Sequence, residues 1–120
     1  MSEPLERAWV LYVRDMLRFA ENVLTYSAGL DQAGFVAARV VYDACLRNLE
    51  LIGEAATHVP DSVRASSPSI PWRLIIALRN RLIHGYLGID DDTIWGIVQK
   101  EVPALVVDLR AMLAAQSEQR

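Results

Sequence analysis

The chain has 120 residues, of which 12 are basic and 15 acidic, so its formal net charge is −3, and 52% of its residues are hydrophobic. This length is enough for one domain with a real core, and we expect a single domain over residues 1–120. No run approaches the roughly 20 apolar residues of a membrane span. The N-terminal sequence MSEPLER also lacks the basic-then-apolar order of a signal peptide. We therefore expect a cytoplasmic protein without membrane segments.

Several kinds of site are missing from the sequence. Two histidines and the single cysteine, Cys45, cannot build a zinc-finger cluster. There is no glycine-rich phosphate loop and no G-x-S-x-G nucleophile turn. The sequence therefore predicts neither a metal site nor a cofactor.

The first predicted helix runs from about Pro4 to Tyr26. Pro4 suits a first-turn position, and Gly29 fits the left-handed position that ends a helix. Apolar residues recur at alternating steps of four and three, which is typical of a helix packed along one seam. These residues are Leu5, Trp9, Tyr12, Met16, Phe19, Val23 and Tyr26.

A second helix is predicted from Asp31 to about Val59, with Asp31 or Gln32 at its start and Pro60 ending it. Its apolar side contains Phe35, Ala38, Val41, Cys45, Leu49, Ile52, Ala56 and Val59. Its polar residues follow at steps of four, three, four and four, and so lie on one stripe. This stripe comprises Asp43, Arg47, Glu50, Glu54 and His58.

The polar stripe has two interpretations. It is a solvated face laced with ion pairs, or it serves a site. In the second case Arg47 and Asn48 support the site, or Glu50 and Glu54 hold an arginine across an interface.

The prolines and serines of residues 60–71 predict a connector with at most a single helical turn. A third helix is predicted to begin near Pro71, a suitable first helical residue, and Gly85 fits the left-handed position that ends it. Its core stripe is Leu74, Ile75, Leu78 and Leu82. Asn80 and His84 lie one turn apart on another stripe, so His84 occupies the helix end.

Residues 90–93 supply an N-cap and an acidic first turn for a fourth helix. Pro103 should kink or break this helix, because proline removes a backbone donor and clashes with the preceding turn. No period-two alternation marks a strand. The fold class predicted is all-α, an up-and-down four-helix bundle with an extra short helix and a kinked C-terminal helix.

The stretch RNRLIHGY, residues 79–86, holds the chemistry of the chain. From Ser62 to Ile89 the sequence has no Asp or Glu but has four arginines and one histidine. A local basic segment in an acidic protein indicates a site for an anion such as a phosphate.

A ribonuclease that uses no metal needs three groups: a base, an acid and a cation. The base takes the proton of the ribose 2′-OH, the acid protonates the leaving 5′-oxygen, and the cation stabilises the crowded phosphorus centre. Histidine suits the proton transfers because its unperturbed pKa is about 6.5, and arginine presents a charged planar fork to phosphate. Arg79 and His84 are the right types for such catalytic residues. Asn80 could orient the histidine or donate to a phosphate oxygen.

The helical spacing leaves two arrangements open. Five residues on a helix correspond to about 140° of rotation, so Arg79 and His84 do not share a face, and Arg79 falls inside the apolar arc. Arg79 then either pairs with a carboxylate such as Glu50 or Glu54 in a structural role, or a second chain completes a site around a two-fold axis. The second arrangement supplies two histidines, one as base and one as acid.

Tyr86 also has two interpretations. It is a core anchor after the helix terminator, or a partly exposed hydroxyl that contacts RNA or accepts a modification. A nucleotide added there would place negative charge and bulk where a substrate phosphate docks.

RNRLIHGY followed by GIDDDTIW resembles the signature of the HepT-like toxins, in the wider HEPN superfamily of α-helical domains. The HEPN mark is Arg, four to six residues, then His, which is matched by Arg79 and His84, and the HepT-type extension places Tyr86 two positions later. The stretches YDACLRNLELIGEAA, PSIPW and YVRDMLRFAENVLTY also resemble the family pattern. The resemblance covers nearly the whole chain.

The resemblance implies a helical bundle that is a homodimer with a composite active site at the dimer cleft, cutting RNA (mRNA or tRNA) without a metal ion. It implies the catalytic residues Arg79 and His84, with Asn80, Arg47 and Glu50 in support. It also implies a type VII toxin–antitoxin system, in which an MntA-like nucleotidyltransferase antitoxin AMPylates Tyr86. Two alternatives use the same residues: a non-catalytic helical partner of a nucleotidyltransferase, and a bundle that binds a nucleotide without turnover.

Overall fold

The computed structural model describes residues 3–85 and 88–118, with the side chains of residues 8–85 and 88–117. All regular structure in these residues is helical, which confirms the predicted all-α class. The elements in chain order are α1 (Glu3–Ser27), α2 (Gln32–Ala37), α3 (Arg39–Thr57), α4 (Asp61–Ala65), α5 (Trp72–Ile83), α6 (Asp91–Gly96), the π-helical segment η1 (Ile97–Glu101) and α7 (Val102–Glu118). None of the described helices combines the length and the apolar character needed to cross a membrane.

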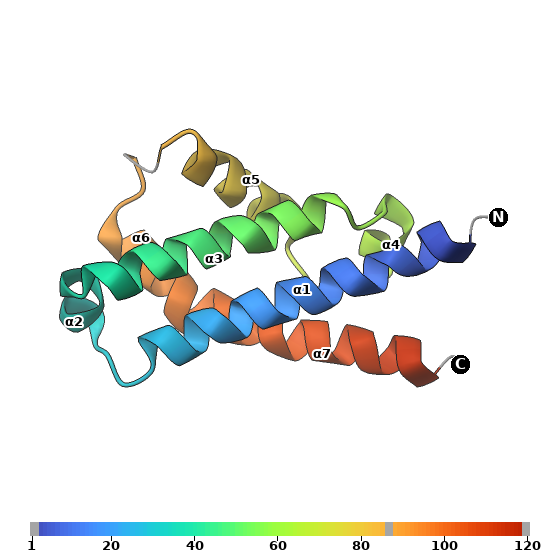
Figure 1. The fold of residues 1–120 in the computed structure, drawn as a ribbon, viewed down its shortest axis with the longest axis horizontal. Coiled ribbons are helices and arrows are strands. Elements are labelled where there is room, and N and C mark those ends of the chain that lie inside the picture. The colour runs from blue at the N-terminus through green and yellow to red at the C-terminus, as the bar shows by residue number, and fades with distance from the viewer. Residues whose placement is uncertain (1–2, 86–87, 119–120) are drawn as a thin grey trace.

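The long helices form an up-and-down bundle (Figure 1). α1 lies between α3 and α7, and α5 packs against α3. Along the chain, α1, α3, α5 and α7 run in alternating directions, each opposite to the one before it. Because α5 has α3 as its main neighbour, most of its surface faces outward, with Leu74 and Ile83 exposed. The prediction that Leu74 belongs to the core stripe is therefore wrong.

One hydrophobic core runs through the bundle. α1 supplies the predicted seam residues Met16 and Val23, both fully buried, together with Val13. The other fully buried large side chains are Phe35, Cys45, Val59, Ile70, Ile94, Val98, Val102 and Leu109. Together these side chains come from α1, α2, α3, α6, η1, α7 and the loops beside α4, and Trp72 and Leu82 of α5 join the same cluster, so these elements share one apolar interior.

The predicted helix over residues 31–59 is divided at Ala38, where ψ is 81°. Asp31 caps its start as expected, since the Asp31 carboxylate accepts from the Gly34 N–H at 2.8 Å. The break redirects α2 toward α6, and the Phe35 ring packs against Tyr42 and Trp95 with centroids 5.3 and 5.2 Å apart. Packing against a distant segment therefore overrides a helical pattern that is locally continuous.

The C-terminal helix is distorted just ahead of Pro103, as the sequence predicts. The Asp90 carboxylate caps its start by accepting from the Thr93 N–H at 2.7 Å. The chain then runs through the π turn Ile97–Glu101 before α7 begins at Val102. Proline has no N–H for the carbonyl four residues earlier, and a wider turn at that point accommodates the loss without ending the helix.

Both glycines predicted to end helices have left-handed backbones, with φ of 79° at Gly29 and 98° at Gly85. Residues with a side chain rarely adopt this region. Gly85 therefore ends α5 directly after His84, which is the C-cap residue of that helix.

α3 and α5 cross most closely at Gly53. A Cβ atom built there would lie 2.2 Å from Arg79 Cβ, 2.9 Å from Arg79 Cγ and 3.0 Å from the Ile75 carbonyl oxygen. The absence of a side chain at Gly53 thus allows the Arg79 stem to rest directly on the α3 backbone.

We expect Gly53→Ala to destabilise the protein by about 1–3 kcal/mol, because overpacking at a close helix crossing forces the backbones apart. Chemical denaturation followed by circular dichroism measures the change. Gly96→Ala is the matched control, since nothing lies within 4 Å of a Cβ at that helical glycine. This control should be neutral or stabilising by up to about 1 kcal/mol. Equal effects of the two changes would contradict the close crossing.

Candidate active site

His84 stands at the exposed C-terminal end of α5. Its backbone N–H donates to the Asn80 carbonyl at 3.2 Å, which closes the last turn. Among the described residues, no hydrogen bond or ion pair holds its imidazole. The ring is therefore open to solvent and available for proton transfer.

Arg79 turns the other way, toward α3. Its Nη2 donates to the Glu54 carboxylate and its Nη1 to the Asn80 side-chain oxygen at 2.9 Å. The side chain is 26% exposed. Its Nε is buried without a hydrogen-bond partner. The guanidinium is thus fixed on two sides and partly open on the rest.

The structure decides which carboxylate Arg79 meets. It is Glu54, while Glu50 pairs with Arg47 at 3.0 Å within α3. The Asn80 side-chain oxygen accepts from Arg79, and within the described part of the chain no hydrogen bond joins the Asn80 side chain to the His84 imidazole. Within one chain, Arg79 packs on α3 while His84 lies exposed past the end of α5, as their helical spacing requires.

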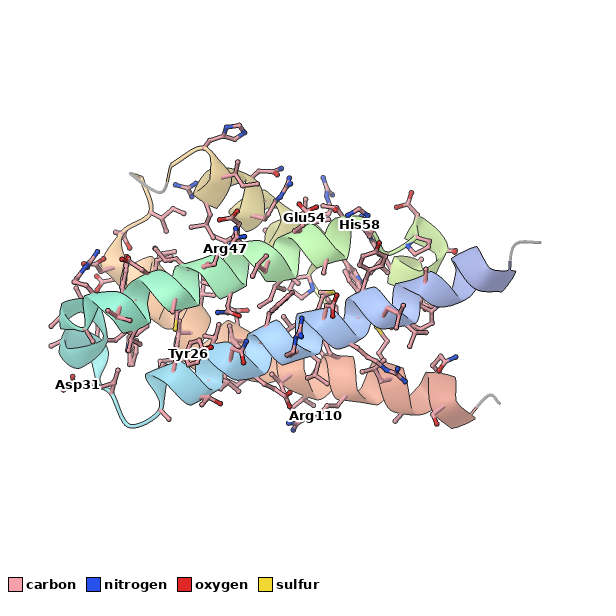
Figure 2. All side chains as sticks on the ribbon, in the orientation of Figure 1. Tyr26, Asp31, Arg47, Glu54, His58 and Arg110 are labelled. Carbon is pink, nitrogen blue, oxygen red and sulfur yellow. The ribbon has the colours of Figure 1, made fainter. Side chains whose placement is uncertain are left out.

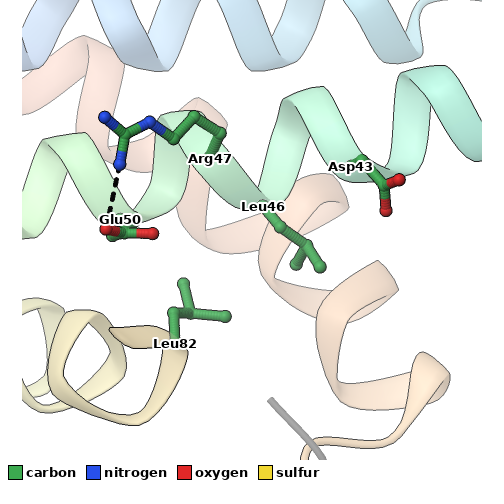
Figure 3. Close-up of a pocket in the computed structure, with 5 residues that line it drawn as sticks. All are labelled: Asp43, Leu46, Arg47, Glu50 and Leu82. Carbon is green, nitrogen blue, oxygen red and sulfur yellow. Dashed lines mark hydrogen bonds and ion pairs between the residues drawn. The ribbon is translucent and has the colours of Figure 1, made fainter. Parts of the chain in front are cut away.

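A hollow of about 150 Å³ opens between α3 and the C-terminal half of α5. It is lined by Asp43, Leu46, Arg47, Glu50 and Leu82 (Figure 3). The Arg47–Glu50 ion pair lies at this hollow, and Arg47 is the more exposed partner, at 63% against 26%. Such an exposed pair is weak, so Arg47 is free to exchange Glu50 for another anion.

Glu54 is the centre of a polar chain that spans three helices. One carboxylate oxygen accepts from Arg79, and the other lies 3.3 Å from His58 Nε2. These bonds, that of His58 first, hold the pKa of Glu54 below its usual 4.5. The His58 ring in turn stacks on Tyr12 of α1, with centroids 4.7 Å apart and planes at 18°. Figure 2 shows Glu54 and His58 near the C-terminal end of α3.

The remaining polar stripe is laced with ion pairs, as one interpretation of the sequence holds. Besides the pairs of Arg47 and His58, Arg39 lies 3.9 Å from Asp43. The exposed Arg81 donates through Nη2 to the Gly88 carbonyl at 3.0 Å, which connects Gly88 to α5.

The predicted modification site, Tyr86, lies outside the described residues.

Sequence reasoning missed two features of this site. Gly53 was not singled out, although a glycine inside an apolar helix pattern is a signal of close backbone approach. The stacking of Tyr12 on His58 was also not anticipated, because periodicity assigns Tyr12 to the core seam and His58 to the surface.

No group of three His, Cys, Asp or Glu side chains suited to a metal ion occurs among the described residues.

Residues 16–112 match the model of the family described as HepT-like, "Ribonuclease HepT-like". The chain is 35% identical over 94 residues to "Putative RNase MJ1380" of Methanocaldococcus jannaschii, covering 78% of this chain and 86% of the relative. It is 30% identical over 101 residues to "Probable ribonuclease HepT" of Thermococcus cleftensis, covering 84% and 92%. No solved structure matches the chain significantly.

Proposed function

Because the chain belongs to the HepT-like ribonuclease family, it is a ribonuclease, and we propose that it cuts RNA without a metal ion as the toxin of a toxin–antitoxin system. The observation that supports this most is the open imidazole of His84, on the same helix as the anchored Arg79 and just past the hollow between α3 and α5. We place this activity in the cytoplasm, with mRNA or tRNA as substrate.

The proposed reaction is an internal displacement at phosphorus. His84 takes the proton of a ribose 2′-OH, and the 2′-oxygen attacks the adjacent phosphorus. The bond to the 5′-oxygen breaks, and that oxygen receives a proton from an acid, leaving a cyclic phosphate and a free 5′-hydroxyl. Arg79 stabilises the charge on the phosphate oxygens, because a guanidinium remains charged and offers several donors.

A site assembled from two chains supports this chemistry better than one chain does. Within one chain the Arg79 guanidinium faces α3 and His84 projects from the helix end. The outward surface of α5, with Leu74 and Ile83 exposed, is available for a second copy. A two-fold arrangement would supply both an imidazole base and an imidazolium acid.

The proposed regulator is an MntA-like nucleotidyltransferase antitoxin that transfers AMP to Tyr86. Tyr86 lies two positions after His84 in the sequence. An added AMP would bring negative charge and bulk close to the imidazole, and so oppose the docking of a substrate phosphate.

We expect the purified protein to cut single-stranded RNA in the presence of EDTA, and His84→Ala to abolish the cutting. The reason is that the variant loses the base for the 2′-OH proton, and the other histidine of the chain, His58, lies at the end of α3 and not at α5. Gel analysis of a labelled RNA measures cutting, and circular dichroism checks that the variant retains its helices. Full activity of His84→Ala would exclude His84 as a catalytic residue.

A shared site predicts how activity falls when wild-type chains are mixed with His84→Ala chains. If one site needs His84 of both subunits, one as base and one as acid, an equal mixture after subunit exchange retains about one quarter of the wild-type activity. Independent sites would retain about half. The mixture is assayed at constant total protein, and a monomeric active protein in light scattering would contradict the shared site.

Tyr86→Phe should remain an active ribonuclease and escape neutralisation by the nucleotidyltransferase, because phenylalanine lacks the hydroxyl that accepts AMP. Mass spectrometry after incubation with the partner and ATP measures the adduct, and the RNA assay measures the residual activity. An adduct on the Phe variant would place the modification elsewhere.

A further inference from the structure

We infer that Glu54 is a positioning residue for Arg79 in the ribonuclease reaction, braced from behind by His58 and Tyr12. This inference rests on the proposed function, in which Arg79 binds the phosphate being cut. It adds a residue of α3, outside the segment that carries Arg79 and His84, to the parts that activity needs.

The contacts fix the guanidinium in orientation as well as in place. Nη2 of Arg79 donates to one Glu54 oxygen, and Nη1 donates to the Asn80 side chain. Each Nη nitrogen carries two N–H groups, so one on each nitrogen stays free for a phosphate oxygen. Two anchors on different residues leave little freedom to rotate about the last side-chain bonds.

The stem of Arg79 is fixed by the same helix. Gly53, the neighbour of Glu54 in sequence, provides the flat backbone on which the Arg79 Cβ and Cγ atoms rest. Gly53 thus contacts the base of the Arg79 side chain, and Glu54 binds its guanidinium. From this crossing the Arg79 side chain reaches the Glu54 carboxylate.

Stability alone does not account for this arrangement. The close packing leaves Arg79 Nε buried without a partner, and an unsatisfied buried donor lowers stability. The ion pair itself is partly exposed, with Glu54 at 46%, and pairs of this kind contribute little. An apolar side chain at position 79 would fill the crossing without the unsatisfied donor, so the arginine and its anchor point to a use beyond packing.

Glu54 is itself held in place. Its second oxygen lies 3.3 Å from His58 Nε2, and the His58 ring stacks on Tyr12. The chain of contacts therefore runs from α1 through α3 to the guanidinium on α5. Because Tyr12 belongs to the long helix α1, the brace is anchored in the body of the bundle.

The test compares Glu54→Ala with Glu21→Ala in the RNA-cutting assay. Glu21 is a matched control, because it also pairs with an arginine of another helix, Arg110, and is 43% exposed. We expect Glu54→Ala to lower kcat by about 10²-fold, the cost of a misplaced catalytic group. Glu21→Ala should leave kcat unchanged. Glu54→Gln, which keeps the shape and an acceptor oxygen but loses the charge that pairs with Arg79, should lower kcat measurably but by less than Glu54→Ala.

A second measurement separates positioning from a general loss of structure. If Glu54 acts through Arg79, then Glu54→Gln should cost much less kcat in an Arg79→Lys background than in the wild type. Equal costs in both backgrounds would overturn the inference, and this comparison remains valid if Glu54→Ala fails to fold.

The outcomes distinguish this inference from the proposed function. Wild-type kcat in Glu54→Ala, together with an inactive His84→Ala, would overturn the positioning role and leave the ribonuclease site intact. A wild-type protein that cuts no RNA would overturn both.

Discussion

The aliphatic stem of Arg79 rests on the backbone at Gly53, and this contact sets the distance between α3 and α5. The other contacts of the candidate site depend on that distance. Any side chain at position 53 would separate the helices, since its Cβ would lie 2.2 Å from that of Arg79. At the observed distance Arg79 reaches Glu54. One turn further along, the same two helices diverge enough to leave the hollow between Glu50 and Leu82. The absence of a side chain at Gly53 thus lets the Arg79 guanidinium reach Glu54, and the hollow lies one helical turn away.

The parts of the fold that sequence predicted are those decided locally. Gly29, Gly85 and Asp90 end or cap helices through their own backbone or side-chain chemistry, and each does so as expected. The break at Ala38 was not predicted, because its cause is the packing of Phe35 against a segment 60 residues away. Nothing in the local pattern around Ala38 carries that information.

The features of the candidate site fall into the same two groups, those decided locally and those that depend on packing between helices. Residue types and spacing made Arg79 and His84 the candidate site residues, which stays a prediction, and the spacing correctly placed them on different sides of α5. They left Glu50 and Glu54 open as partners, since both lie on the same stripe of α3. The choice depends on where along α3 the two helices cross, and Gly53 decides it. The crossing point is a property of two faces together, so a single helical pattern does not contain it.

The distribution of charge reconciles an acidic protein with an anionic substrate. The acids of α3 that face this region are already engaged, Asp43, Glu50 and Glu54 each lying beside an arginine. On α5, by contrast, the exposed Arg73 and Arg81 meet no carboxylate among the described residues. The net charge of −3 is therefore a poor guide to the local field, because nearby charges dominate once distant ones are screened over about 10 Å. Under the proposed function, an RNA phosphate that approaches α5 would meet Arg73, Arg81 and His84, none of which faces a carboxylate among the described residues.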